Sequence, residues 1–288
     1  MFRTTLIAAT LSIAFAGAHA AQPLQVKVYN ADGNSFNVNS TLVYGEKEAM
    51  VIDAGFTRAD ALRIAANVLD SGKELKTIYV SQADPDYYFG VETLKEIFPT
   101  AEVVTTPAVL AKINAKLAGK IAFWGPKMGA NAPRTPVLPK AISGTTLTVD
   151  GQTVEIRGAT GALGHRPYAW IPSIKAVVGN IGVFGTNMHV WTADTQTVAE
   201  RSAWVAQLDE MAALQPAMVV PGHMPAGTAL DVSNVTYTKG YLQAFEKNAA
   251  AAKNSAELID AMKKAYPAAP MGLSLEIGAK VNKGEMKW

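Results

Sequence analysis

Cysteine is absent from this sequence of 288 residues, and histidine occurs only four times. Without cysteine the chain can form no disulfide bond, and any metal ion would have to be held by nitrogen and oxygen ligands. The histidines are few enough to be considered one by one. His19 lies near the N-terminus, and the others are His165, His189 and His223.

A strong excess of charge is also missing, because 26 Lys and Arg residues face 24 Asp and Glu residues with no block of like charge. Such a balance provides no basic field for a nucleic acid and no charged face for a membrane surface. After the N-terminal segment, no apolar run is long enough to span a bilayer. We therefore expect a small-molecule substrate or ligand, no nucleic-acid partner and no stable membrane insertion. Nothing in the pattern indicates the oligomeric state.

Two common catalytic motifs are missing as well. No Gly-x-Ser-x-Gly elbow occurs, which argues against a serine hydrolase. The glycine-rich stretch 158–164 lacks the Lys-Ser/Thr pair of a phosphate-binding loop, so we do not interpret it as one.

Residues 1–20 have the features of a secretory signal peptide. Arg3 supplies the positive charge, 6–15 is apolar, and Ala18-His19-Ala20 fits a cleavage site with small residues. A membrane anchor is the alternative, but the apolar run is short for one. We predict a mature protein that starts near Ala21 and is periplasmic or secreted.

The remainder, 21–288, is expected to form a single domain in which strands and helices alternate. Strands are predicted at 24–29, 40–44, 49–52, 77–80, 102–105, 147–149, 154–156, 168–171, 176–178 and 217–220. Helices are predicted at 58–69, 91–98, 108–117, 198–214, 237–250 and 256–265. The stretch 119–139, rich in Gly and Pro, is expected to be a packed loop containing Phe123 and Trp124. This order predicts a layered α/β fold.

The most informative stretch is 78–90, where a short apolar run ends in a group of polar side chains. They are Gln82, Asp84, Asp86 and Tyr87. Polar groups at the point where a strand gives way to a helix lie where α/β proteins bind ligands. A simpler interpretation makes Asp86 the N-cap of the following helix.

This stretch resembles the metal-binding segment of the metallo-β-lactamase superfamily, whose pattern is His-x-His-x-Asp-His. Three of its four ligand positions are changed, because the chain has Gln82, Asp84 and Tyr87 around Asp86. The resemblance implies an αββα sandwich, in which two packed sheets carry helices on both outer faces. It covers nearly all of the mature chain.

Two of the histidines fall on ligand positions of that family. His165 precedes Arg166 in a segment similar to the family's Gly-His-Thr-Pro, with Arg where Thr is usual. His223 closes a Pro-Gly-His segment that matches the family pattern. Asn180 stands where the family has the Asp that bridges two metal ions, and an amide cannot supply that charge.

Two further residues correspond to family positions. Asp53 matches an Asp that orients the metal-binding loop through hydrogen bonds. His189 lies in a loop where relatives have a substrate-facing His; the alternative is a surface His beside a buried Trp191.

The resemblance implies a secreted, metal-dependent hydrolase with an atypical, mononuclear site. The predicted metal ligands are Asp84, Asp86, His165 and His223. The metal would be Zn or a harder ion such as Mn, because oxygen donors outnumber imidazoles once Gln82 and Tyr87 are counted with these ligands. Asp84 and Asp86 are the predicted catalytic residues.

The predicted substrate contacts are Gln82, Tyr87, Asn180 and His189. An alternative hypothesis is that the metal centre is lost and the fold serves as a periplasmic module that binds a small ligand or a partner. Tyr87 and Asn180 favour this alternative, since each replaces a side chain that the family uses to hold metal.

Overall fold

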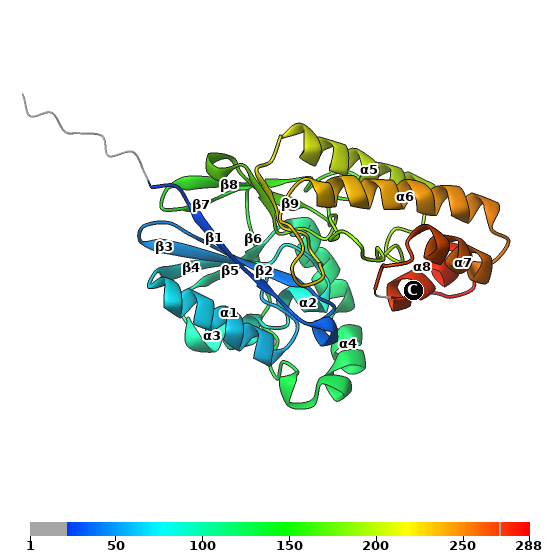
Figure 1. Ribbon diagram of the computed structural model, residues 1–288. Helices are drawn as coiled ribbons and strands as arrows, with labels where there is room; N and C mark the ends of the chain where they lie inside the picture. Colours follow the sequence, from blue (N-terminus) through cyan, green and yellow to red (C-terminus); the bar gives the residue numbers. More distant parts are fainter. Residues whose placement is uncertain (1–21, 271) are drawn as a thin grey trace, which may run out of the picture.

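The computed structural model describes residues 22–270 and 272–288, so the predicted signal peptide lies outside the described residues. Two sheets pack face to face, with helices on both outer sides (Figure 1). The predicted αββα sandwich is therefore confirmed. Within the described residues, no helix combines the length and apolar character needed to cross a membrane.

The first sheet has six strands in the order β1-β2-β3-β4-β5-β6. Their bounds are β1 Gln25–Asn30, β2 Asn39–Tyr44, β3 Glu48–Ile52, β4 Glu74–Tyr79, β5 Glu102–Thr105 and β6 Lys140–Ala141. Strands β1 to β3 pair antiparallel, whereas β3 to β6 run parallel. The carboxyl ends of β3 and β4 therefore meet at one edge, where the site is built.

The second sheet has five strands in the order β11-β10-β9-β8-β7. Their bounds are β7 Thr146–Val149, β8 Gln152–Arg157, β9 Tyr168–Ile171, β10 Ala176–Val178 and β11 Met218–Val219. Only β10 and β11 pair in parallel.

Alternation along the strands gives the sheets two buried faces. In β2 and β3, Leu42 and Val51 face the helices, whereas Val43, Met50 and Ile52 face the second sheet. Side chains on opposite faces of the same strand thus enter different apolar layers, which is what four stacked layers require.

The helices cover the two outer faces. Their bounds are α1 Arg58–Ser71, α2 Pro85–Tyr88, α3 Val91–Ile97, α4 Pro107–Met128, α5 Val198–Ala213, α6 Ser233–Ala251, α7 Ser255–Ala265 and α8 Gly272–Asn282. Helices α1, α3 and α4 pack on the first sheet, and α5 and α6 pack on the second (Figure 1). Helices α7 and α8 pack beside α6 and against each other.

The prediction of a loop over 119–139 is wrong for its first half, because α4 continues to Met128. Leu117, Ile121, Trp124 and Met128 recur every three or four residues and pack on the first apolar cluster. Trp124 also makes edge contacts with the rings of two core phenylalanines, at centroid distances of 5.3 and 5.5 Å. This burial outweighs the weak helix propensity of glycine and the proline in the last turns.

Candidate functional site

The loop after β4 is held by a buried carboxyl group at the end of β3. Asp53 accepts hydrogen bonds from the backbone N–H and the hydroxyl group of Ser81, both at 2.7 Å. Asp53 thus orients the loop that carries the polar side chains, as its sequence position predicted. Burial raises the pKa of Asp53 to about 7, although both Ser81 hydrogen bonds oppose the shift.

Asp86 and His223 meet at the base of the site. Oδ2 of Asp86 lies 3.5 Å from Nε2 of His223, and both side chains are buried. Asp86 lies within α2, whose N-cap is Asp84, so the interpretation of Asp86 as an N-cap is wrong. Helix α2 begins at Pro85, two residues earlier than an N-cap at Asp86 would allow, because proline suits the first position of a helix.

The remaining contact of His223 determines its tautomer. Nδ1 lies 3.0 Å from the carbonyl oxygen of Phe36, which can only accept, so Nδ1 carries a proton. Burial raises the pKa of Asp86 to about 8, with the charge of Asp84 as the next cause. Burial also lowers the pKa of His223 to about 4. A protonated Asp86 therefore faces the lone pair of a neutral His223.

Tyr87 and Asn180 interact with each other and with the backbone. The Tyr87 hydroxyl donates to the carbonyl oxygen of Asn180 at 3.3 Å. The Asn180 side chain donates to the carbonyl oxygen of Val220 at 3.0 Å and accepts from the N–H of Val183 at 2.8 Å. Burial raises the pKa of Tyr87 well above its ordinary value, so its phenol stays protonated. Both side chains support the backbone beneath the pocket and do not line it.

Gln82, Asp84 and His165 line a pocket of about 360 Å³ above this layer. Gln82 is buried and donates to the carbonyl oxygen of Pro167 at 2.8 Å. Asp84 lies 3.7 Å from Nζ of Lys120. Burial, with help from the charges of Lys112 and Arg166, lowers the pKa of His165 to about 4. His165 is therefore neutral at pH 7.

The four predicted metal ligands do not form one cluster. In the described ranges 22–270 and 272–288, no group of three or more His, Asp or Glu side chains lies close enough to hold a metal ion. Asp86 and His223 touch each other, while Asp84 faces Lys120 and His165 lines the pocket. Since a catalytic zinc site uses three protein ligands, these residues as arranged do not fit such a site.

Arg166, which the sequence marks only as a departure from the family's Thr, is a buried residue of the pocket lining. Its side chain lines the pocket and is only 4% exposed. The guanidinium carbon lies 4.5 Å from the ring centroid of Trp204, a contact that favours a cation over the aromatic face. The positive charge of Arg166 acts on Asp84, on His165 and on His223. A fixed cation thus lies among the positions at which the sequence predicted metal ligands.

The outer wall of the pocket comes from the loop before α5 and from the last residue of the sequence. Asp194 accepts from the indole N–H groups of Trp191 at 2.7 Å and Trp288 at 3.0 Å. The two indole rings meet edge to face at 5.0 Å. The complete lining comprises Gln82, Ala83, Asp84, Lys112, Lys116, His165, Arg166, Asp194, Gln196, Thr197, Glu200 and Trp288.

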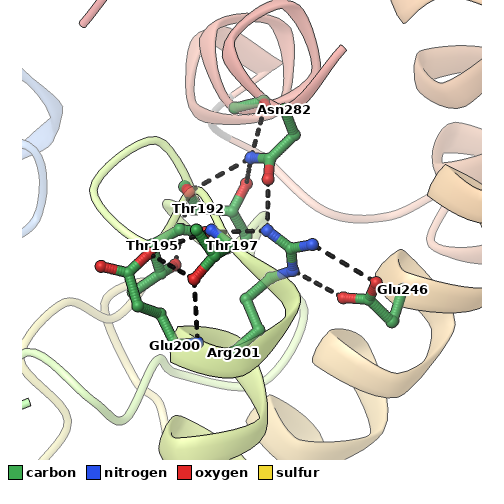
Figure 2. A network of polar contacts seen from close by, with 8 residues as sticks. Thr192, Thr195, Thr197, Glu200, Arg201, Glu246 and Asn282 are labelled. Carbon is green, nitrogen blue, oxygen red and sulfur yellow. Dashed lines mark hydrogen bonds and ion pairs between the residues drawn. The ribbon is translucent and has the colours of Figure 1, made fainter. Parts of the chain in front are cut away.

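A buried polar network fixes this loop (Figure 2). Arg201 of α5 pairs with Glu246 of α6 at 2.6 Å and donates to the carbonyl oxygen of Thr195 at 2.9 Å. It also donates to Asn282 of α8, which in turn donates to the carbonyl oxygen of Thr192 at 3.2 Å. Residues 192–197 are therefore tied to three helices, which gives the pocket a firm wall.

His189 lies outside the pocket lining. It is buried, with Nδ1 3.0 Å from the hydroxyl oxygen of Tyr241, so the alternative of a surface histidine is wrong. Trp191 is the more exposed of the two side chains, because its indole reaches outward to Asp194.

Comparisons with known proteins agree with this architecture. Residues 33–175 match the family model described as Metallo-beta-lactamase superfamily. No curated protein matches the sequence.

Solved structures of the same fold cover most of the chain. A metallo-beta-lactamase family protein from Thermus thermophilus is 16% identical, with a TM-score of 0.62, over 91% of this chain and 92% of its own. A beta-lactamase domain protein from Burkholderia ambifaria is 12% identical, with a TM-score of 0.63, over 91% and 84% respectively. A metallo-beta-lactamase from Pontibacter korlensis is 17% identical, with a TM-score of 0.52, over 78% and 97%. At these identities the similarity concerns the fold alone.

Proposed function

Since this chain belongs to the metallo-β-lactamase superfamily, we propose that it uses the superfamily's pocket to bind a small molecule without a metal centre. The observation that carries this proposal is the position of Arg166. Its guanidinium lies among the predicted ligand positions, where only Asp86 and His223 meet. A fixed cation opposes the entry of a metal ion through charge repulsion.

The chemistry of the other positions supports the same conclusion. With Asp86 protonated and His223 neutral, the pair carries no net charge, so it needs no cation beside it. Asn180 and Gln82 direct their amide groups to the backbone. With a signal peptide in front, such a protein acts as a binding module in the periplasm or outside the cell.

Thermal unfolding of the mature chain after chelator treatment tests the proposal. Zn²⁺ or Mn²⁺ is expected to leave Tm unchanged, whereas a small molecule that binds the pocket raises Tm with its concentration. A control is the Asp86→Asn variant, which is expected to give the same flat response to metal. A saturable rise of Tm with either metal in the unaltered chain, lost in this variant, would contradict the proposal.

A metal-dependent hydrolase, with Zn or Mn, is the second candidate, because Asp86 and His223 still lie 3.5 Å apart. Turnover of lactam, lactone or phosphoester substrates tests it. Metal-dependent turnover that Asp86→Ala and His223→Ala both abolish would establish this candidate in place of the binding module.

A further inference from the structure

Arg166 has unusually few partners for a buried guanidinium. Its Nη2 donates to the carbonyl oxygen of Ile181 at 3.5 Å, which is a long hydrogen bond. Its buried Nε has no hydrogen-bond partner within 22–270 and 272–288. Among the described residues no carboxylate forms an ion pair with it. The acids whose charges act on it are Asp194, Asp84 and Glu200, none of which reaches ion-pair distance. Because a buried charge is costly without a directly bonded counter-ion, this geometry leaves room for an anion on the guanidinium.

The acids that line the pocket already have other partners. Asp84 pairs with Lys120, and Asp194 accepts two indole N–H groups with Lys116 3.7 Å away. Glu200 accepts from the backbone N–H and the hydroxyl of Thr197, both at 3.0 Å. Among the described residues, none of these carboxylates forms a hydrogen bond or ion pair with Arg166, and they act on it only through their charge.

We infer that the pocket binds a small organic carboxylate, with the carboxylate group on the guanidinium of Arg166. A guanidinium matches the planar, two-oxygen geometry of a carboxylate. Lys112, an exposed side chain, lines the same pocket and adds positive charge to it. This inference rests on the proposed function, since it names the class of ligand for that same pocket.

The surrounding charges favour a single negative charge on the ligand. Asp84, Asp194 and Glu200 lie around the pocket, and a phosphate dianion would meet their repulsion. The ring of Trp288, 46% exposed and held at its N–H by Asp194, offers an apolar surface for the body of the ligand. The volume of about 360 Å³ suits a molecule with one ring.

Calorimetric titration of the chelator-treated mature chain tests the inference with three probes of similar shape: benzoate, benzamide and phenyl phosphate. We expect benzoate to bind at least about tenfold more tightly than either of the others. Arg166→Gln is expected to remove that preference. Arg157→Gln, on a half-buried arginine outside the pocket that pairs with Glu155 and Glu210, is the matched control and is expected to keep it.

A second pocket variant guards against a folding defect in Arg166→Gln. Lys112→Gln changes an exposed side chain and is expected to weaken benzoate about twofold to threefold, with benzamide unchanged. Equal binding of benzoate and benzamide would overturn the carboxylate inference and leave the binding module standing. If no probe binds and added Zn²⁺ binds with measurable heat, both the inference and the proposed function fail.

Discussion

Asp86 and His223, which come from opposite halves of the chain, lie 3.5 Å apart in the folded protein. Helix α2 carries the first, and the segment that bridges the two sheets beside Val38 and Phe184 carries the second. Nδ1 of His223 is committed to the carbonyl oxygen of Phe36, so the unprotonated Nε2 faces Asp86, whose pKa burial raises to about 8. Within the described part of the chain, Arg166 is a buried cation of the pocket whose Nε has no hydrogen-bond partner.

The Asp86 carboxyl group makes stability depend on pH. Its pKa is about 8 in the folded protein and roughly 4 in an unfolded chain, so the folded state binds more protons between these values. The contribution of the protonated Asp86 to the free energy of unfolding is fully present below about pH 4 and is lost as pH rises to 8. Asn does not titrate, so Asp86→Asn is expected to keep its stability over this range. The Tm of the variant minus the Tm of the unaltered chain should therefore rise between pH 5 and pH 8.

The control for this titration has the opposite sign. Asp150 accepts from the backbone N–H groups of Lys47 and Glu48, which lower its pKa. Asp150→Asn is therefore expected to cost stability at neutral pH and to converge with the unaltered chain as pH falls. A Tm difference for Asp86→Asn that stays constant with pH would contradict the assigned protonation.

Gly90 allows the loop after α2 to approach β3 closely. A Cβ atom at this position would lie 2.0 Å from the carbonyl oxygen of Ala54, which is backbone and cannot move aside. Gly90→Ala is expected to destabilise the fold by about 1–3 kcal/mol in denaturant unfolding. Gly119→Ala, on an open face of α4, is expected to stabilise it by up to about 1 kcal/mol. Equal effects of the two variants would show that Gly90 is not tightly packed.

The Arg201 network is expected to matter more than a surface ion pair. Arg201→Met leaves Glu246, Asn282 and the carbonyl group of Thr195 without their donor, at a cost of about 2–3 kcal/mol. Lys239→Met breaks an exposed pair with Asp209 and should cost less than about 0.5 kcal/mol. Urea unfolding of both variants measures the difference. A loss below about 1 kcal/mol for Arg201→Met would argue against the network as a stabilising element.

Most of the fold could be predicted from the pattern of strands and helices together with the family resemblance. The turn residues 45–48 predicted a hairpin of 40–44 with 49–52, which β2 and β3 form, and the Pro-Gly-His segment located His223 at the site. The helical continuation through Trp124 could not be predicted, because it depends on packing against Phe36 and Phe56, which are distant in the sequence.

The site was harder to predict than the fold. The sequence indicates which side chains occupy the ligand positions, but their partners become visible only in three dimensions. Asp84 faces Lys120, and Gln82 faces the backbone of Pro167. The sequence shows Arg166 only as an unusual residue after His165. Its proposed role depends on the unpaired Nε, which only the folded structure reveals.

A crystal of the chelator-treated mature chain soaked with 4-bromobenzoate tests the central claim most directly, because the bromine atom is located by anomalous scattering. We expect the carboxylate within hydrogen-bond distance of the Arg166 guanidinium and no metal ion between Asp86 and His223. A metal ion bound by Asp86 and His223, or an anion bound elsewhere with Arg166 still unpaired, would contradict the account.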